Sequence, residues 1–434
     1  MSRPMAGWRR VIAPRAPGDD VVPLPARLYA LLRDGAWLDR RRMRAYGLIL
    51  LAINAGAMLV VGARALGLFL PLEGFATLDF DSFYAAGRLT LNGTPALAYD
   101  MAAHKAAEHA IYGRADLGYN FFFYPPVLLL LCPLLALLPF GWAFVAWGCG
   151  QALLFAAALR AVLGRAATLL PCLAFPSAVL SLAMGQNALL TAGLFAGGTA
   201  LLGRNRPFAA GLVLGCLCYK PHFGLLLPVA LLAGRQWRAI AGAATSVAAL
   251  GAAVTLLFGP DIWTAYWRLF TTTGPATFAN GPVPPGHLVS VFGAALQAGA
   301  PPAVANGLQA AAALGAAALV ARLWRGPAPL APRAIALVAG TMLSVPVILY
   351  YDLTAAAVCL AWLAVDARRT GWLAWEKAFV VLAFAIALFA RGAGAHHLPL
   401  GPLVALGFLA VAWRRSRYEL EKGDAYDVEI VDYH

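Results

Sequence analysis

LDFDSFYAAGRLTLNGTPALAYD, residues 78–100, is the longest polar interruption between apolar runs in the first half of the chain, and FFFYPP follows it at residues 121–126. The stretch comes soon after the first strongly apolar run, residues 45–70. At 1.5 Å per residue, that run is long enough to cross a hydrocarbon layer of about 30 Å. The sequence therefore predicts a membrane anchor with several carboxylates placed just beyond it.

The composition of the whole chain extends this interpretation. The chain has 434 residues, of which 61% are hydrophobic and 12% charged, whereas a soluble domain has about 25% charged residues. This predicts an all-α protein that crosses the membrane many times. The net charge of +13 does not indicate a nucleic-acid partner, because the arginines cluster at the ends of apolar runs, as the positive-inside rule requires. The six cysteines lie in apolar stretches without zinc-site spacing, so neither a metal site nor a disulfide framework is indicated.

The alternation of apolar and basic segments predicts three parts. Residues 1–44 form a basic cytoplasmic segment in which residues 25–44 are expected to make an interfacial helix. Residues 45–413 form the membrane domain, with outer loops at 71–140 and 259–301, and residues 414–434 form a solvated cytoplasmic tail. About twelve spans are expected, several of them shorter than the usual 20 residues. Their approximate positions are 45–70, 141–163, 167–184, 186–202, 207–219, 222–234, 239–258, 302–324, 332–350, 353–366, 372–391 and 397–413.

The first outer loop is expected to contain several helices that do not cross the membrane. Residues 83–91 and 101–112 have helix-forming composition, and the sequence Asn-Gly-Thr-Pro at 92–95 predicts a turn between them. Residues 127–140 are apolar but short and contain two prolines, so a re-entrant or interfacial helix is predicted there. Short helices at membrane depth must be buried in protein or line a cavity, which indicates a cavity open to the outer face.

Asp79-Phe80-Asp81 is a D-x-D pattern, which in nucleotide-sugar transferases holds a metal and a diphosphate. The pattern alone is weak evidence, and here it has no nucleotide-binding fold beside it. It does offer two carboxylates next to a membrane anchor, and either is suited to act as a general base toward a hydroxyl. Ordinary loop charges explain the pair equally well.

Other polar residues lie at membrane depth or at the expected outer tips. Lys220-Pro221-His222 lies between two short apolar runs, where a lysine could neutralise a phosphate or could extend its ammonium to the interface. Gly185-Gln186-Asn187 and Tyr350-Tyr351-Asp352 lie where two predicted spans are expected to be joined on the outer face. Residues that map outward and could together line an anion and sugar site are Arg64, Arg268, His287, Arg391, His396 and His397, with the aromatic residues Tyr84, Tyr99, Tyr124 and Trp263. Individually, each also fits an interfacial or structural role.

Taken in order, these motifs resemble glycosyltransferase family 87. The resemblance rests on D-F-x-x-F-Y-A-A-G-R-L-x-L-x-G-x-P-A-x-A-Y-D at 79–100, Y-P-P at 124–126, P-L-L-A-L-L-P at 133–139, G-Q-N at 185–187, R-P with A-G at 206–211 and K-P at 220–221. It covers roughly residues 45–410. The family groups polyprenyl-phosphate-dependent mannosyltransferases and relatives with the GT-C membrane fold.

The resemblance implies an enzyme that takes a sugar, with mannose the first choice among hexoses and pentoses, from a polyprenyl-phosphate carrier. The acceptor would be a glycolipid or glycan on the outer face of a cell membrane, such as a bacterial plasma membrane. Asp79 would be the catalytic base of an inverting single displacement, with Asp81 the second choice. The motifs of the resemblance and the residues expected to face outward together give these candidate substrate-binding residues: Tyr84, Arg88, Tyr124, Pro125, Pro126, Gln186, Asn187, Lys220, His222, His287, Tyr351 and Asp352.

Within this reading, Lys220 would hold the carrier phosphate, and residues 124–126 would shape the access path of the carrier. Gln186 and Asn187 would face the cavity. A departing phosphate needs charge stabilisation, which a lysine, an arginine or a divalent cation can give, and the sequence leaves open whether a metal takes part.

Two other functions compete with this reading. In a lipid or glycan transporter or flippase, Asp79, Lys220 and Asp352 would gate a substrate path, but the chain shows no internal repeat and its acids cluster in one loop. In a non-catalytic protein that binds the carrier lipid, Asp79→Asn would leave the function intact.

Overall fold

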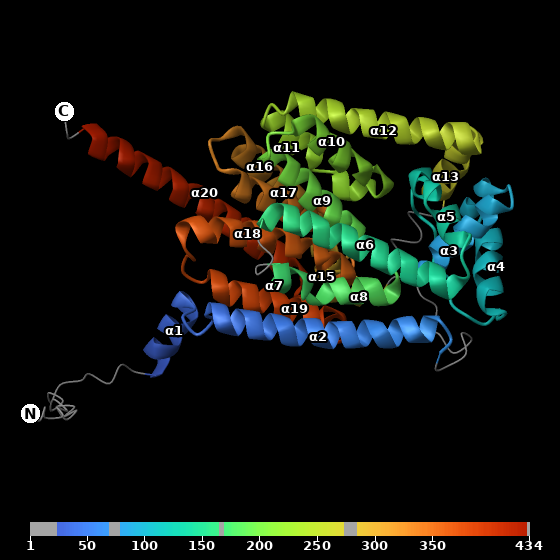
Figure 1. The fold of residues 1–434 in the computed structure, drawn as a ribbon, viewed down its shortest axis with the longest axis horizontal. Helices are drawn as coiled ribbons and strands as arrows, with labels where there is room; N and C mark the ends of the chain where they lie inside the picture. The colour runs from blue at the N-terminus through green and yellow to red at the C-terminus, as the bar shows by residue number, and fades with distance from the viewer. Residues whose placement is uncertain (1–23, 69–78, 165–168, 273–283, 432–434) are drawn as a thin grey trace, which may run out of the picture.

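The computed structural model describes residues 24–68, 79–164, 169–272 and 284–431 (Figure 1). In these ranges the regular structure is helical, and the β-type pairing found there is an isolated bridge between Leu288 and Leu349. The predicted all-α class is therefore confirmed. Parts of the predicted terminal segments and outer loops, residues 1–23, 71–78, 273–283 and 432–434, lie outside the described residues.

Six helical segments of the described chain are long and apolar enough to cross a membrane. They are α2 (Arg40–Ala65), α6 (Phe140–Leu163), α12 (Trp237–Phe258), α16 (Pro302–Arg325), η8 (Tyr350–Ala355) with α18 (Ala356–Thr370), and α19 (Glu376–Ala395). The outer helices expose large apolar side chains: Leu59 on α2 is 74% exposed and Leu256 on α12 is 85% exposed. Such surfaces are stable against hydrocarbon and unfavourable in water, so these helices face lipid.

Further helices, all of them shorter except α20, complete the bundle. These are α7 (Leu169–Leu173), α8 (Pro176–Met184), α9 (Ala188–Gly203), α10 (Pro207–Gly215), α11 (Leu227–Ala233), α17 (Leu330–Ser344) and α20 (Gly401–Val431). The predicted span at 167–184 is two helices, because Pro176 lacks the N–H that would continue α7. The predicted number of twelve spans stays a prediction.

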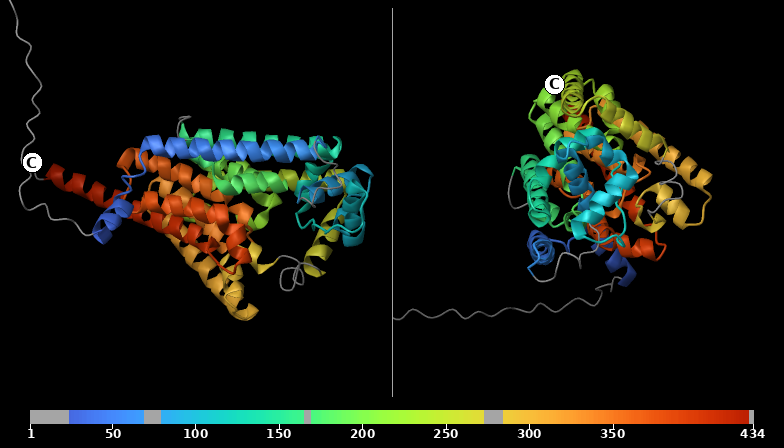
Figure 2. Two further views of the ribbon diagram at one scale, coloured as in Figure 1. Left: turned by 90° about the horizontal axis from the view of Figure 1, so that it is seen from below. Right: turned by 90° about the vertical axis from the view of Figure 1, so that its right-hand side faces the viewer.

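The centre of the bundle is formed by α17 and α18. Residues 334–339 of α17 are fully buried, and α17 packs against α16, α18 and α20. In the right-hand view of Figure 2, orange segments of the carboxyl-terminal half lie behind the cyan helices, among green, yellow and blue ones. Helices that are apolar on all sides, as α17 is, are stable only when neighbours or lipid surround them.

One end of the bundle carries the helices of the first predicted outer loop. The turns and helices there are α3 (Phe80–Leu91), η2 (Pro95–Tyr99), α4 (Met101–Tyr112), η3 (Pro126–Leu130) and α5 (Cys132–Ala136), together with α13 (Asp261–Thr272) from the second loop (Figure 1). The helices predicted at 83–91 and 101–112 are confirmed, and Gly93 takes a φ of 77° in the predicted turn. We call this the loop end of the molecule.

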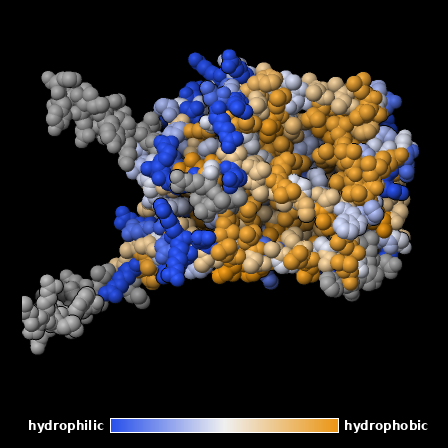
Figure 3. All heavy atoms as spheres, viewed as in Figure 1, coloured by the Kyte–Doolittle hydropathy of each residue, from blue (hydrophilic) through white to orange (hydrophobic). Residues whose placement is uncertain are grey.

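The opposite end, which we call the basic end, collects the arginines. Arg204 after α9 donates to the Ala161 carbonyl of α6, and Arg368 of α18 donates to the Leu163 carbonyl. Hydrophilic residues gather at this end in Figure 3, where α1 (Leu24–Asp34) and α20 also lie, while apolar residues cover the middle. The charge asymmetry is the one expected for a membrane protein with a fixed orientation.

The carboxyl-terminal segment differs from its prediction. α20 continues past residue 413 without a break, to Val431. Arg415 is 1% exposed and forms ion pairs with Asp366 of α18 and Glu376 of α19. The prediction of a solvated tail beginning at Arg414 was therefore wrong for Arg415, because two buried carboxylates far away in the sequence neutralise its charge.

Candidate functional site

Asp79 is the residue immediately before α3, and the contact between α3 and the end of α8 decides where its carboxylate lies. α8 ends at Gly185, whose φ of 68° lies in the left-handed region that glycine adopts without strain. A Cβ on Gly185 would collide with Phe80 and come within 3.0 Å of the Phe144 ring. The glycine therefore lets α3 approach closely, and Gln186 Nε2 donates a hydrogen bond of 2.8 Å to Asp79 Oδ2.

The turn between α8 and α9 is fixed through its carbonyl oxygens. Gln151 Nε2 of α6 donates to the Gln186 carbonyl at 2.8 Å. The Tyr219 hydroxyl donates to the Asn187 carbonyl at 3.2 Å. Because the backbone is held from behind in this way, the two amide side chains are free to face the site.

Lys220 follows η5 (Cys216–Tyr219), and Pro221 ends the helix there because it has no N–H and restricts the residue before it. The Lys220 ammonium donates to Asp352 Oδ1 at 2.7 Å and to Asn187 Oδ1 at 3.2 Å. The Lys220 and Asp352 side chains are 5% and 1% exposed. The site therefore contains a buried ion pair between residues 132 positions apart.

Asp352 lies in the first turn of η8 and is held by its own segment as well. Its Oδ2 accepts a hydrogen bond of 3.2 Å from the Leu349 backbone N–H. The same segment pairs with the second predicted outer loop, since the Val289 N–H donates to the Ile348 carbonyl at 2.9 Å. The second loop is thus connected to the ion pair.

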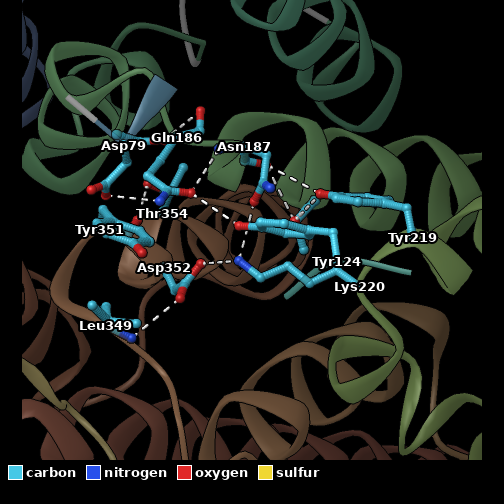
Figure 4. Close-up of polar contacts among 12 residues, drawn as sticks. Asp79, Tyr124, Gln186, Asn187, Tyr219, Lys220, Leu349, Tyr351, Asp352 and Thr354 are labelled. Carbon is cyan, nitrogen blue, oxygen red and sulfur yellow. Dashed lines mark hydrogen bonds and ion pairs between the residues drawn. The ribbon is translucent and has the colours of Figure 1, made fainter. Parts of the chain in front are cut away.

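Tyr124 links the two halves of this arrangement. Its hydroxyl donates to Gln186 Oε1 at 3.3 Å, and the Tyr99 hydroxyl donates to the Tyr124 carbonyl at 3.1 Å. Figure 4 shows Asp79 and Tyr351 at the left of the cluster, the Asp352–Lys220 pair near its centre, and Tyr124 and Tyr219 at the right. Residues from five regions of the sequence therefore meet at the loop end.

The electrostatics of the site favour a proton acceptor at Asp79. Burial raises the pKa of the Asp79 carboxyl above its usual range, and the negative charge of Asp352 adds to the rise. The Gln186 hydrogen bond and the positive charges of Arg391 and Lys220 lower the pKa, but less than burial raises it. A carboxylate with a raised pKa is a stronger base than an ordinary aspartate, so Asp79 is suited to take a proton from a hydroxyl.

The described residues do not use the full hydrogen-bonding capacity of Asn187 and Lys220. Asn187 is fully buried, and its Nδ2 has no hydrogen-bond partner among the described residues. The Lys220 ammonium has three N–H groups, of which the contacts to Asp352 and Asn187 use two. Buried donors left without acceptors are costly, so this place is suited to an oxygen-rich anionic or hydroxylated ligand.

A second cation lies on the open side of the site. Arg391 of α19 is exposed, and its guanidinium carbon lies 5.7 Å from the centre of the Tyr350 ring. His287 meets the same ring edge-on at 5.7 Å, and burial together with the charge of Arg391 lowers the pKa of His287. Arg391 therefore adds positive charge that the described residues do not pair with a carboxylate.

Asp81, the second candidate base, faces a different neighbourhood. It is fully buried in α3 and accepts a hydrogen bond of 2.6 Å from the Tyr112 hydroxyl of α4. Nearby, burial raises the pKa of Glu108 to about 9 and lowers that of His104 to about 4. These contacts join α3 to α4, whereas Asp79 contacts Gln186 in the turn between α8 and α9.

The other predicted substrate-binding residues divide into two groups. Tyr351 lies beside Asp79, and Pro125 and Pro126 lead from Tyr124 into η3, close to the site. The following three do not belong to the cluster of Figure 4: Tyr84, whose hydroxyl donates to the Leu138 carbonyl; Arg88, which is exposed on the last turn of α3; and His222, which is exposed, with its ring tilted by 58° to that of Phe223.

The sequence analysis missed residues that support the site from behind. Gln151 and Tyr219 fix the turn that carries Gln186 and Asn187. A glutamine in the middle of an apolar span was a usable signal, because polar groups at membrane depth need partners. Tyr219 had no such signal, since tyrosine is common near membrane interfaces.

Taken together, the site brings a carboxylate with a raised pKa, an unpartnered amide donor and two cations near one another. This arrangement can remove a proton from a hydroxyl and stabilise negative charge nearby, as group transfer from a phosphate requires. In the described part of the chain, His, Cys, Asp and Glu side chains form no group of three or more that could hold a metal ion.

Comparisons with known proteins agree with this chemistry. The model of glycosyltransferase family 87 matches residues 122–349, which is more than half of the chain and includes Tyr124, Gln186, Asn187 and Lys220. Neither the curated proteins nor the solved structures contain a match. The family match, the apolar helices and the order of the motifs lead to one conclusion: the chain belongs to glycosyltransferase family 87 and is a membrane glycosyltransferase.

Proposed function

We propose that this enzyme transfers mannose from a polyprenyl-phosphate carrier to a glycolipid or glycan acceptor on the outer face of a bacterial plasma membrane. The observation that carries the proposal is the Asp79 carboxylate, held at 2.8 Å by Gln186 next to the Lys220–Asn187 donors. The loop end would face outward, because the basic end is expected to face the cytoplasm.

The proposed architecture is the GT-C membrane fold with about twelve spans in residues 45–413. It is supported by the way successive helices alternate between the basic end and the loop end. The residues that meet at Asp79 come from turns between helices, and such an alternation would place these turns on the same face of the membrane. The amino-terminal segment and the end of α20 would lie in the cytoplasm.

In the proposed reaction, the acceptor hydroxyl attacks the anomeric carbon of the lipid-linked sugar. The new C–O bond forms while the bond from the anomeric carbon to the phosphate oxygen breaks. The hydroxyl proton moves to Asp79, and the electron pair of the broken bond leaves on the polyprenyl phosphate. A single displacement of this kind inverts the anomeric centre.

Lys220 and Arg391 would stabilise the departing phosphate from two sides. Lys220 would use its remaining N–H, with Asn187 Nδ2 beside it, while Asp352 keeps the ammonium in place. Arg391 would approach from the open side above Tyr350. Preorganised donors of this kind are effective because they need no rearrangement when charge develops.

The test is transfer of radiolabelled mannose from a short-chain polyprenyl-phosphate carrier to membrane lipids by the purified protein. We expect wild type to transfer and Asp79→Asn to lose about 10²- to 10⁴-fold in rate, the usual contribution of a general base. The matched control is Asp116→Asn, an exposed carboxylate of the same loop that pairs with Arg114.

Carrier binding is measured in parallel with the same variants and with Lys220→Met. We expect Asp79→Asn to bind the carrier normally and Lys220→Met to bind it weakly. Equal transfer by Asp79→Asn would rule out the base assignment. Binding without transfer of any of several sugars would instead favour a transporter or a non-catalytic carrier-binding protein.

A further inference from the structure

A groove of about 770 Å³ is lined mainly by α16, α17 and α20. Its bottom includes Leu343 of α17, and its side on α20 is formed by Leu406 and Leu409. Its lining is apolar apart from one charged side chain, that of Arg322. No residue of the site described above contributes to it.

The groove exists because one face of α16 carries small residues. Ala312, Gly315, Ala316 and Leu319 are spaced three and four apart, so they lie on the same face of the helix. Nothing lies within 4 Å of the position that a Cβ on Gly315 would take. This face of α16 therefore leaves open space that a side chain of ordinary size would fill.

At the basic end, the groove closes on a cation and an aromatic ring. The Arg322 guanidinium carbon lies 5.3 Å from the centre of the Trp413 ring. Arg322 is exposed, and no described carboxylate pairs with it. Tryptophan is typical of the membrane–water interface, and a guanidinium stacked on a ring keeps its N–H groups available to a phosphate.

The dimensions of the groove match one leaflet. From Ala312 to Arg322 the helix rises about 15 Å, at 1.5 Å per residue. This is about half of a hydrocarbon core of roughly 30 Å. An occupant with its head at Arg322 and its chain along Gly315 would therefore lie wholly in the leaflet at the basic end.

We propose that this groove is a binding site for an anionic phospholipid, with its phosphate at Arg322 and an acyl chain along the small-residue face of α16. The charge of Arg322 favours an anionic headgroup over a neutral one, because basic pockets between membrane helices attract acidic lipids. The bound lipid fills the space between α16 and α20 and holds α20 against the bundle. This proposal is independent of the donor and acceptor proposed above.

The experiment uses the full-length protein in nanodiscs of phosphatidylcholine, with or without phosphatidylglycerol, and measures retained lipid by native mass spectrometry and thermal unfolding. We expect wild type to retain phosphatidylglycerol selectively and to unfold at a higher temperature with it. Arg322→Gln should bind phosphatidylglycerol about fivefold more weakly, the effect expected for one basic residue near the surface. The matched control is Arg325→Gln. Arg325 lies one turn further along α16, outside the groove, so this variant should behave as wild type.

A second variant tests the acyl-chain part without changing charge. Gly315→Leu fills the groove and should fold, because its side chain meets open space and leucine favours helix more than glycine does. We expect it to lose retention of phosphatidylglycerol while Arg322 is intact. Retention equal to wild type in both variants, or equal retention of both lipids by wild type, would overturn the proposal. It would also be overturned if wild type proved to be a lipid-free dimer that Gly315→Leu converts to a monomer, because a second copy of the chain would then occupy the groove.

Discussion

Asp79 is the residue whose surroundings decide the chemistry of the site. The carboxylate is half-buried, it is held by Gln186, and the negative charge of Asp352 lies near enough to raise its pKa further. An aspartate on an open loop would have a pKa near its usual value and would be a weak base. The close approach of α3 to Gly185 therefore turns an ordinary loop carboxylate into a useful proton acceptor.

The raised pKa predicts the pH dependence of the enzyme. A base works only when ionised, so kcat/KM should fall as the pH is lowered through the pKa of Asp79. Because burial raises that pKa, the loss should begin at a higher pH than for an exposed aspartate. The measurement is kcat/KM against pH for wild type and Asp79→Glu. If kcat/KM falls only in the pH range of an ordinary carboxylate, or if the fall occurs at the same pH in Asp79→Glu, a group other than Asp79 causes it.

At the scale of elements, α3 and α5 pack closely against each other at the loop end. Gly87 of α3 faces the start of α5, where an added Cβ would lie 2.6 Å from the Cys132 carbonyl carbon and 2.9 Å from the Ala136 Cβ. Backbone atoms cannot move aside as a flexible side chain can. The glycine therefore sets the distance between the helix that follows Asp79 and the chain that follows Tyr124.

Gly87→Ala should destabilise the protein by about 1–3 kcal/mol, the usual cost of overpacking. The measurement is thermal unfolding in detergent, with transfer activity recorded alongside. Gly150→Ala is the matched control, because Gly150 is in α6 and nothing lies within 4 Å of an added Cβ there. We expect the control to be neutral or slightly stabilising. Equal unfolding temperatures for the two variants would show that α3 and α5 can move apart.

At the scale of the whole molecule, Arg415 joins three helices at the basic end. Its guanidinium donates to Glu376 Oε1 and Oε2 at 2.8 and 2.6 Å and to Asp366 Oδ2 at 2.7 Å. A bidentate arginine contact fixes orientation as well as distance. α18, α19 and α20 are thus held together at the end of the bundle opposite the site.

Arg415→Met should cost about 3–5 kcal/mol of stability, because it leaves two buried carboxylates without a counter-charge. The neighbouring Arg414→Met should cost little, since Arg414 is exposed and donates only to the Ala374 carbonyl. Thermal unfolding of both variants measures the difference. Similar stability of the two would mean that the buried carboxylates find protons or other partners.

Much of the general plan could be predicted from the chain alone. The low charge and long apolar runs require a membrane helix bundle, because the hydrocarbon core accepts only backbones whose polar groups are paired internally. The alternation of apolar and basic segments predicted that the turns carrying Asp79, Gln186, Lys220 and Asp352 all lie on the outer face of the membrane. The structure brings these four residues together. The ordered motifs indicated the family that the comparisons then showed.

The sequence by itself thus determined that this protein lies in a lipid bilayer, that it is helical, and which turns lie at the same end of the helix bundle. The tertiary structure alone decided that Asp79 rather than Asp81 faces Gln186, that Lys220 pairs with Asp352, and that Arg415 is buried. The physical reason is that hydropathy and charge fix how each helix is inserted. The lateral order of the helices and the direction of each side chain depend on close contacts between residues distant in the chain.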